Sequence, residues 1–358
     1  MSAGLSVAQA GDVSGSLEFL TVDQFMRTLI DIRALKSAFE LGLIDRLIEA
    51  RTGGAIDALG RTVGADAVGM RFLLDLLSTA GVVEERGDDV RLTRRFRDAL
   101  RFRDLMETKL DFVGVVLNDF ADLFTLQVRA PNEFMGQARL FHLFDYRRAA
   151  TVSHENYVRT RMWMRLTTAL SRYEAAAAAM LHDFSQHARM LDVGGNSGEF
   201  VLRLCRQHQA LRATVFDLPM VCEIGMEHVL SKPEHDRISF IKGDIRKDSL
   251  PPGHDLISFK SMLHDWPIRD AAQFIARAAQ ALAPGGRILI FERAPMRFRD
   301  VAPPLSLLPT LLFFRSYRPA SEYLEYLGQL GFQDLRCREI DLDSPFYLIT
   351  GRKPGARG

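Results

Sequence analysis

The sequence predicts an α/β protein in which a mainly helical N-terminal region precedes a doubly wound, mostly parallel seven-stranded sheet. Apolar residues recur at three- and four-residue spacing from Leu17 to about Ala179, which is typical of amphipathic helices. After about His187, short β-branched runs alternate with helical segments, as in βα units on a parallel sheet. The chain has 358 residues, which is too long for one ordinary core, so we expect two domains.

The composition indicates a globular protein and argues against several classes. Hydrophobic residues make up 47% of the chain and the formal net charge is +1, so binding of polyanions through bulk charge is not expected. The three cysteines, Cys205, Cys222 and Cys337, are far apart, which indicates neither a disulfide framework nor a thiolate zinc site. Neither a signal peptide nor an apolar run of the ~20 residues that a membrane helix needs is evident, so we expect a cytoplasmic protein.

The N-terminal half divides into three expected segments. Residues 1–16 form a flexible lead-in. Residues 17–103 are helical and contain a helix, a turn, a second helix and a short hairpin, in which GVVEER and VRLT flank Gly87, Asp88 and Asp89. This order is typical of a winged-helix domain. Residues 104–186 form a helical connector that ends near an alanine-rich helix former.

The remaining residues, 187–358, carry the strands of the predicted sheet. Five of them lie in ARMLDVGG, RATVFDLP, RISFIKGD, HDLISFKSML and GRILIFERA. Two more, LRCREIDL and SPFYLITGRK, close the chain without a convincing helix between them. We therefore expect a terminal antiparallel hairpin and a reversed final strand.

The stretch LDVGGNSGEF at 191–200 is the most specific motif. We expect a strand that ends at Val193 and a helix that begins at about Glu199. The glycines between them allow close approach of a ligand, and the helix N-terminus offers free N–H groups. The glycine spacing differs from that of dinucleotide-binding proteins.

Two acids follow at the tips of the next two strands. Asp217 ends the second strand, where it can accept hydrogen bonds from ribose hydroxyls. Asp244 ends the third, where it can accept from an adenine amino group. Either acid alone is more often a helix cap or turn residue, but the glycine turn and both acids in consecutive βα units indicate nucleoside binding.

The pattern resembles the class I S-adenosylmethionine-dependent methyltransferases. It is most similar to the small-molecule O-methyltransferases, which include the plant caffeic-acid type and bacterial antibiotic-tailoring enzymes. The matching pieces are LDVGGNSGEF, TVFDLP, FIKGD, KSMLHDW and APGGRILIFE, in the family's order. The helical half resembles that family's dimerisation domain. The resemblance implies S-adenosylmethionine as cofactor, a homodimer, a small-molecule acceptor, and no nucleic-acid or membrane partner.

The resemblance also implies a set of cofactor contacts. The glycine turn would hold the methionine part, Asp217 the ribose and Asp244 the adenine, on which Ile245 would pack. The implied set is Asp192, Gly194, Gly195, Asn196, Asp217, Leu218, Asp244, Ile245, Lys260 and Trp266.

His264 is the candidate general base. An ordinary histidine pKa of about 6.5 leaves a neutral base at pH 7, and His264 follows a strand at the sheet edge where ligands bind. A lone histidine there is more often a turn or capping residue, but the family places its base at this position. Asp265 is expected to point elsewhere and to cap a helix that begins near Pro267.

A histidine base needs an orienting acid. The family supplies two, and Glu292 matches the first. An alignment on Arg318 puts Tyr317 where the second glutamate is expected, and a phenol carries no charge at pH 7. We assign His264, Glu292 and Tyr317 to the candidate catalytic group.

The acceptor is expected to be flat and apolar or aromatic, because the predicted lining is rich in such residues, although each alone is more often core. The lining comprises Trp163, Met164, Met262, Leu308, Leu312 and Phe313. Nearby arginines could grip an anionic acceptor or form a solvated surface. These are Arg293, Arg297, Arg299, Arg315 and Arg318.

The sequence thus predicts methyl transfer to a hydroxyl of a small acceptor, with no metal. Three alternatives stay open at this point. The same fold could methylate an acidic carbon, for example of a 2-oxo acid, or use the cofactor for other chemistry, and Tyr317 keeps this open. A winged-helix DNA-binding regulator is disfavoured by the charge. A metal-dependent enzyme is the third alternative: the histidines do not cluster with carboxylates at ligand spacing, although Asp244 and His264 could meet in space.

Overall fold

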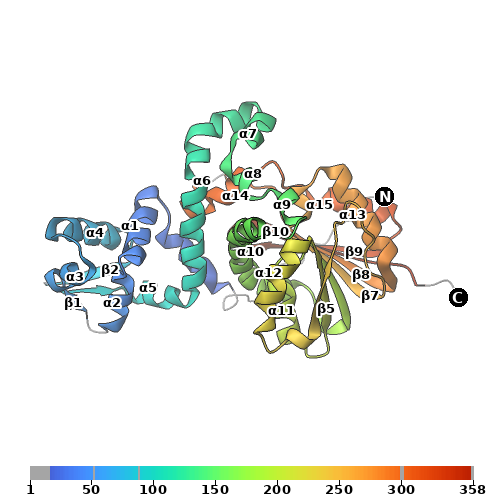
Figure 1. Ribbon diagram of the computed structural model, residues 1–358, viewed down its shortest axis with the longest axis horizontal. Helices are drawn as coiled ribbons and strands as arrows, with labels where there is room; N and C mark the ends of the chain where they lie inside the picture. Colours follow the sequence, from blue (N-terminus) through green and yellow to red (C-terminus); the bar gives the residue numbers. More distant parts are fainter. Residues whose placement is uncertain (1–16, 51–52, 88, 299–301, 356–358) are drawn as a thin grey trace. The chain divides into compact units, whose positions relative to one another are not determined.

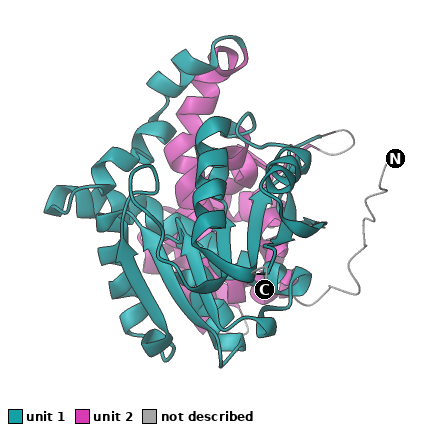
Figure 2. Cartoon of the chain, turned by 90° about the vertical axis from the view of Figure 1, so that its right-hand side faces the viewer, with its two compact units in different colours: residues 1–17, 129–297, 312–358 teal, residues 18–128, 298–311 magenta. Residues whose placement is uncertain are grey.

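The computed structural model describes residues 17–50, 53–87, 89–298 and 302–355, and the chain divides into two compact units (Figure 2). The helical unit comprises residues 18–128 and 298–311, and the sheet unit comprises residue 17 with residues 129–297 and 312–358. The expected segments divide at 103/104, which is where the helix Arg103–Arg129 begins, whereas the two units divide at 128/129, near its end. The expected lead-in, 1–16, lies outside the described residues.

The helical unit contains the predicted helices and hairpin (Figure 1). Strands β2 (Val83–Arg86) and β3 (Asp89–Leu92) pair antiparallel as expected, and β1 (Gly54–Ala55) adds a third strand. Asp66 caps α4 by accepting from the backbone N–H groups of Val68 and Gly69. The other elements are η1 (Glu18–Phe25), α1 (Leu29–Glu40), α2 (Leu43–Glu49), α3 (Ile56–Val63), α4 (Ala67–Thr79), α5 (Arg94–Ala99), η2 (Leu100–Phe102), α6 (Arg103–Arg129), η6 (Leu305–Leu307) and α14 (Leu308–Leu312), of which α14 runs into the sheet unit.

The sheet unit begins with helices and continues as alternating strands and helices (Figure 1). Its helices are α7 (Pro131–Gln137), α8 (Arg139–Leu143), α9 (Tyr146–Ala149), α10 (His154–Leu181), η3 (Phe184–Gln186), α11 (Glu199–Gln207), α12 (Pro219–Leu230), η4 (His235–Arg237), η5 (Leu263–Asp265), α13 (Ile268–Ala281) and α15 (Ala320–Gln329). Its strands are β4 (Arg189–Val193), β5 (Arg212–Asp217), β6 (Ile238–Lys242), β7 (His254–Lys260), β8 (Leu282–Arg293), β9 (Gln333–Asp341) and β10 (Pro345–Arg352). Over the described ranges, no helix is long and apolar enough to cross a membrane.

The seven strands form one sheet in the order β6-β5-β4-β7-β8-β10-β9. The pairs from β6 to β8 are parallel, and β10 runs antiparallel to both β8 and β9. The predicted reversed final strand and terminal hairpin are therefore confirmed. Because parallel strands end at one edge, the ends of β4, β5, β7 and β8 all face the same side, where α/β proteins bind ligands.

Both faces of the sheet are buried, and successive strand residues alternate between them. On one face Met190, Leu256 and Leu289 pack with residues of α10, α11 and α12. On the other face Leu191 and Ile257 pack with residues of α13 and α15. This double burial fixes the strand register, and so fixes which residues emerge at the ligand-binding edge.

A stacked histidine pair joins the end of α10 to the start of the sheet. The Nε2 atoms of His182 and His187 lie 2.9 Å apart, so one ring donates and the other accepts. Burial lowers the pKa of His182 to about 4 and also lowers the pKa of His187. Both rings are therefore neutral in the folded chain at pH 7.

We expect folding stability to fall as the pH drops from 6.5 towards 4. The folded pKa of His182 lies below its unfolded value, so in this window the unfolded chain binds the proton and the folded chain does not. The contribution is on the order of 2 kcal/mol. In thermal unfolding at a series of pH values, His182→Gln should flatten this dependence, and the same change at exposed His154 should not. Equal slopes in His182→Gln and the unmodified chain would contradict the assignment.

Candidate active site

The glycine turn between β4 and α11 lies at the ligand-binding edge, and its predicted boundaries, Val193 and Glu199, are confirmed. Gly194 has φ +69° and Asn196 has φ +57°, a region that side chains other than asparagine rarely adopt. A Cβ atom on Gly194 would lie 2.6 Å from Cγ of Met262, and one on Gly195 would lie 2.6 Å from Oδ2 of Asp192. The turn therefore requires glycine at both positions.

Asp192 precedes this turn and is buried. Its Oδ1 accepts a hydrogen bond of 2.5 Å from the Ser258 hydroxyl, a partner that the sequence did not indicate. Its Oδ2 is buried without a hydrogen-bond partner. Burial raises the pKa of Asp192 to about 7. A buried acceptor beside the glycine turn is a place for a ligand donor, because an unpaired buried oxygen is costly.

Asp217 ends β5 as predicted and fixes the same turn. One carboxylate oxygen accepts from the backbone N–H of Asn196 at 2.8 Å, and the other accepts from Leu218 at 2.7 Å. Burial raises the pKa of Asp217 to about 6. Each oxygen keeps a second lone pair, so the carboxylate can still accept from a ligand hydroxyl.

Asp244 lies two residues beyond the end of β6 at Lys242, and not at the strand's last residue as expected. Its carboxylate accepts from Nε and Nη2 of Arg246 at 2.8 and 2.7 Å, which holds its pKa below the usual range. The guanidinium of Arg246 lies 5.3 Å from the centre of the Trp266 ring. Ile245, which lies between Asp244 and Arg246 in the chain, is buried.

Lys260 ends β7 and belongs to a buried ionic cluster. Its ammonium group pairs with Glu174 of α10 and donates to the Ser171 hydroxyl at 2.9 Å. Glu174 also accepts from Arg293 at 3.0 Å, and Arg293 lies over the Phe346 ring. The sequence pattern gave no sign that α10 supplies this carboxylate, because Glu174 stands next to an alanine run.

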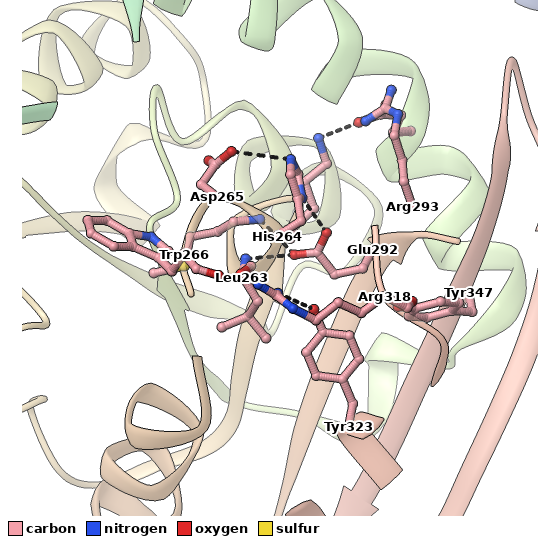
Figure 3. A network of polar contacts seen from close by, with 12 residues as sticks. Leu263, His264, Asp265, Trp266, Glu292, Arg293, Arg318, Tyr323 and Tyr347 are labelled. Atoms are coloured by element: carbon pink, nitrogen blue, oxygen red, sulfur yellow. Dashed lines mark hydrogen bonds and ion pairs between the residues drawn. The ribbon is translucent and has the colours of Figure 1, made fainter. Parts of the chain in front are cut away.

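His264 lies in the short turn η5 and is held by Glu292 at the end of β8 (Figure 3). The Nδ1 atom of His264 lies 2.6 Å from Oε2 of Glu292. The other oxygen of Glu292 accepts from the backbone N–H groups of Met262 and Leu263, at 2.8 and 2.7 Å. One buried carboxylate thus fixes both the turn and the ring that the turn carries.

Glu292 and His264 each stabilise the charged form of the other. Burial acts to raise the pKa of Glu292, but His264 and the two backbone donors outweigh it and the pKa is lowered. Burial acts to lower the pKa of His264, but the carboxylates of Glu292 and Asp265 outweigh it and the pKa is raised. Nδ1 therefore carries the proton shared with Glu292, and Nε2 is the nitrogen that becomes free when the ring is neutral. The raised pKa of His264 departs from the ordinary value that the sequence argument assumed.

The expectation that Asp265 points elsewhere and caps α13 is wrong. Pro267 occupies the cap position, and no side-chain cap is made. The tight turn of η5 brings Asp265 to the same side as its neighbour, with Oδ1 at 3.4 Å from Nε2 of His264. Oδ2 accepts a 2.7 Å hydrogen bond from the hydroxyl of Tyr146, which the sequence did not single out.

The nearby arginines have separate roles. Arg293 is buried and ion-paired, so it is not part of a solvated surface. Arg318 donates to the carbonyl oxygens of Leu263 and Trp266 and thereby holds η5 from outside. Arg297 and Arg315 are exposed, and Arg299 lies outside the described residues. Neither Arg293 nor Arg318 is therefore available to grip an anionic acceptor as hypothesised.

Aromatic side chains surround His264. The Tyr317 ring lies 5.3 Å and the Phe313 ring 6.4 Å from the imidazole, both edge-on. Burial raises the pKa of Tyr317, so its phenol is neutral at pH 7. Phe144 contacts both Phe313 and Trp163, which extends the aromatic lining away from the base.

The remaining predicted lining residues divide by position. Met262 covers the glycine turn, as its approach to Gly194 shows. Trp163 and Met164 are both buried in a core cluster with residues of α12. Leu308 and Leu312 stand at the two ends of α14, and both are buried. Within the described ranges, no group of three His, Cys, Asp or Glu side chains is arranged to hold a metal ion.

Comparison with known proteins agrees with this geometry. A family model described as an O-methyltransferase domain matches residues 141–333. The tetracenomycin polyketide synthesis 8-O-methyl transferase of Streptomyces glaucescens is 30% identical over 338 residues, which cover 90% of this chain and 93% of that protein. The mitomycin biosynthesis 6-O-methyltransferase of Streptomyces lavendulae is 27% identical over 87% of this chain and 88% of its own. The chain belongs to the O-methyltransferase family.

Solved structures show the same fold for this O-methyltransferase. The human N-acetylserotonin methyltransferase in complex with SAM has a TM-score of 0.71 at 24% identity, covering 97% of this chain and 100% of that one. The mitomycin 7-O-methyltransferase structure has a TM-score of 0.68 at 25% identity, covering 90% of this chain and 94% of that one. This O-methyltransferase thus shares its fold with an enzyme whose solved structure contains SAM.

The site fits that cofactor. The free oxygen of Asp192 and the lone pairs of Asp217 are acceptors, and the ammonium and ribose hydroxyl groups of the cofactor are donors. The glycine turn lets the backbone come close to a ligand at the sheet edge.

We expect Gly194→Ala to weaken cofactor binding. An alanine at φ +69° is strained, and its Cβ would collide with Met262. A loss of about 1–3 kcal/mol of binding free energy corresponds to a loss of about 5–150-fold in affinity. Calorimetric titration with S-adenosylhomocysteine measures it. The control is Gly136→Ala in α7, where nothing lies within 4 Å of the added atom. Unchanged affinity of Gly194→Ala would show that the turn does not bind the cofactor.

Proposed function

We propose that this enzyme transfers a methyl group to a hydroxyl of a small, uncharged aromatic acceptor, with His264 as general base. The observation that carries the proposal is the contact of Nδ1 with Glu292, which leaves Nε2 as the second nitrogen of a ring that lies beside the aromatic side chains of Phe313 and Tyr317. The names of the two Streptomyces relatives specify O-methylation in tetracenomycin and mitomycin synthesis, which supports a hydroxyl acceptor of the same general kind.

The chain's own residues would act on the proton. When bound, S-adenosylmethionine supplies an activated methyl group on a positively charged sulfur. Nε2 of His264 would accept the hydroxyl proton as the acceptor oxygen becomes a nucleophile. Glu292 would hold the ring orientation and stabilise the imidazolium, while its two backbone hydrogen bonds keep the carboxylate in place.

The cofactor contacts follow from the strand ends. Asp192 and the backbone of Gly194, Gly195 and Asn196 would hold the methionine part, and Asp217 with Leu218 the ribose. The Asp244–Arg246 pair and Ile245 would border the adenine, with Trp266 beside them. Lys260 would lie beside the cofactor while its ammonium group stays paired with the carboxylate of Glu174.

An uncharged acceptor fits the charges around the base better than an anionic one. His264 stands between two buried carboxylates, Glu292 and Asp265. Arg293 is committed to Glu174, and Arg318 to backbone carbonyls. An added negative charge would therefore meet repulsion without an uncommitted cation among these groups.

We expect His264→Ala to lower kcat by about 10²–10⁴-fold, the usual contribution of a general base. Incorporation of labelled methyl into a panel of phenols and naphthols measures turnover. Cofactor affinity should stay close to that of the unmodified enzyme, since His264 is assigned to the acceptor. His235→Ala, at an exposed position, is the matched control. Full turnover by His264→Ala would refute the base, and no turnover by the unmodified enzyme on any hydroxyl would refute the acceptor class.

We also propose a cytoplasmic homodimer that pairs through the helical unit. Val68 and Phe72 lie four residues apart on one face of α4 and are 80% and 63% exposed, and Ile30 of α1 is 59% exposed. Exposed apolar side chains gathered on neighbouring helices support an interface there.

Phe72→Glu combined with Val68→Glu should convert the dimer to a monomer, because two charges would be buried at the interface. Light scattering after size-exclusion chromatography measures the mass. Leu230→Glu on α12, at a position 71% exposed in the sheet unit, should stay dimeric. A monomeric unmodified protein would refute the proposal.

A further inference from the structure

We propose that Asp265, held in place by Tyr146, is the second carboxylate that serves His264, in the role that the sequence leaves to the neutral Tyr317. Asp265 and Tyr146 are then positioning residues for the base. This inference rests on the proposed role of His264 and assigns two further residues to it.

Asp265 lies close to the imidazole ring of His264. Its Oδ1 lies 3.4 Å from Nε2 of His264. Glu292 lies 2.6 Å from Nδ1, the other nitrogen of the ring. A contact of 3.4 Å is long for a hydrogen bond, so Asp265 acts on His264 mainly through its charge. Nε2 is therefore not tied up by Asp265 and can still receive an acceptor hydroxyl.

Tyr146 holds the carboxylate of Asp265 through a hydrogen bond. The Tyr146 hydroxyl donates to Oδ2 at 2.7 Å, from the start of α9 in a segment more than a hundred residues away in sequence. The Tyr146 ring stacks on Trp266 with centroids 5.8 Å apart and meets the edge of Trp163 at 5.8 Å. The ring is thus fixed on two sides, and its hydroxyl can hold the carboxylate in one orientation.

The groups around the imidazole come from several elements. Glu292 and Arg293 stand on β8, Asp265 on η5, and Tyr317 and Phe313 on the segment after α14. Arg293 opposes the imidazolium charge, and the two carboxylates favour it. Burial and Arg293 both act to lower the pKa of His264. Because Tyr317 is uncharged, the groups that outweigh them and raise this pKa are the carboxylates of Glu292 and Asp265.

Burial raises the pKa of Asp265 itself, whereas His264 and the Tyr146 hydroxyl lower it. Removing the hydroxyl would make Asp265 easier to protonate and weaken its effect on His264. The pKa of His264 should therefore fall when the charge of Asp265 is removed, and fall by less when only its donor is lost.

The test is a histidine ring NMR titration of the full chain, with the His264 signal identified by its loss in His264→Gln. In Asp265→Asn the midpoint should move down by about one pH unit or more, the usual effect of an adjacent opposite charge. Tyr146→Phe should move it in the same direction by less. Tyr157→Phe is the matched control, because Tyr157 also donates to a carboxylate, Glu227, at 2.6 Å but does not face the base.

Two results would overturn the inference. One is a His264 midpoint that Asp265→Asn leaves unchanged, and the other is an equal shift in Tyr146→Phe and Tyr157→Phe. The acidic limb of the kcat/KM profile gives a second readout, since it should shift to lower pH in Asp265→Asn while the maximum rate falls. The titration needs no acceptor, so an enzyme that methylates no hydroxyl would refute the proposed function and leave this test intact.

Discussion

The site depends on one buried carboxylate, Glu292, which ends β8 and accepts three hydrogen bonds. Two of them come from the backbone of Met262 and Leu263 and fix the turn η5, and the third comes from the ring of His264. The strand register places this carboxylate beside the end of β7, because both faces of the sheet are buried and a slip would be costly. The fold therefore decides which nitrogen of the base is committed and which is free.

Much of this arrangement could be predicted from the sequence. The alternation of strands and helices predicted the parallel sheet, and the absence of a convincing helix between the last two strands predicted the hairpin. Asp217, Gly194, His264 and Glu292 all stand at or just after strand ends on one edge. The strand pattern predicted that edge, whereas the choice of Glu292 came from the family resemblance. Short motifs were sufficient to predict these positions because each motif lies within a single βα unit.

The contacts that the sequence could not predict join elements far apart in the chain. Tyr146 reaches Asp265 from α9, and Glu174 reaches Lys260 and Arg293 from the middle of α10. No spacing rule connects such positions. The prediction that Asp265 caps α13 was wrong for a different reason. The tight turn η5 directs the Asp265 side chain towards His264, and Pro267 occupies the cap position. The expected division at 103/104 coincides with the start of α6, and the units divide near the other end of that helix.

The most direct test of the account is a crystal structure of the enzyme with S-adenosylhomocysteine and a hydroxyl acceptor. The account predicts an acceptor oxygen at about 3 Å from Nε2 of His264, the usual hydrogen-bond distance, with Nδ1 still bound to Glu292. An acceptor oxygen that lies away from His264, or a ring rotated so that Nδ1 faces the acceptor, would contradict it.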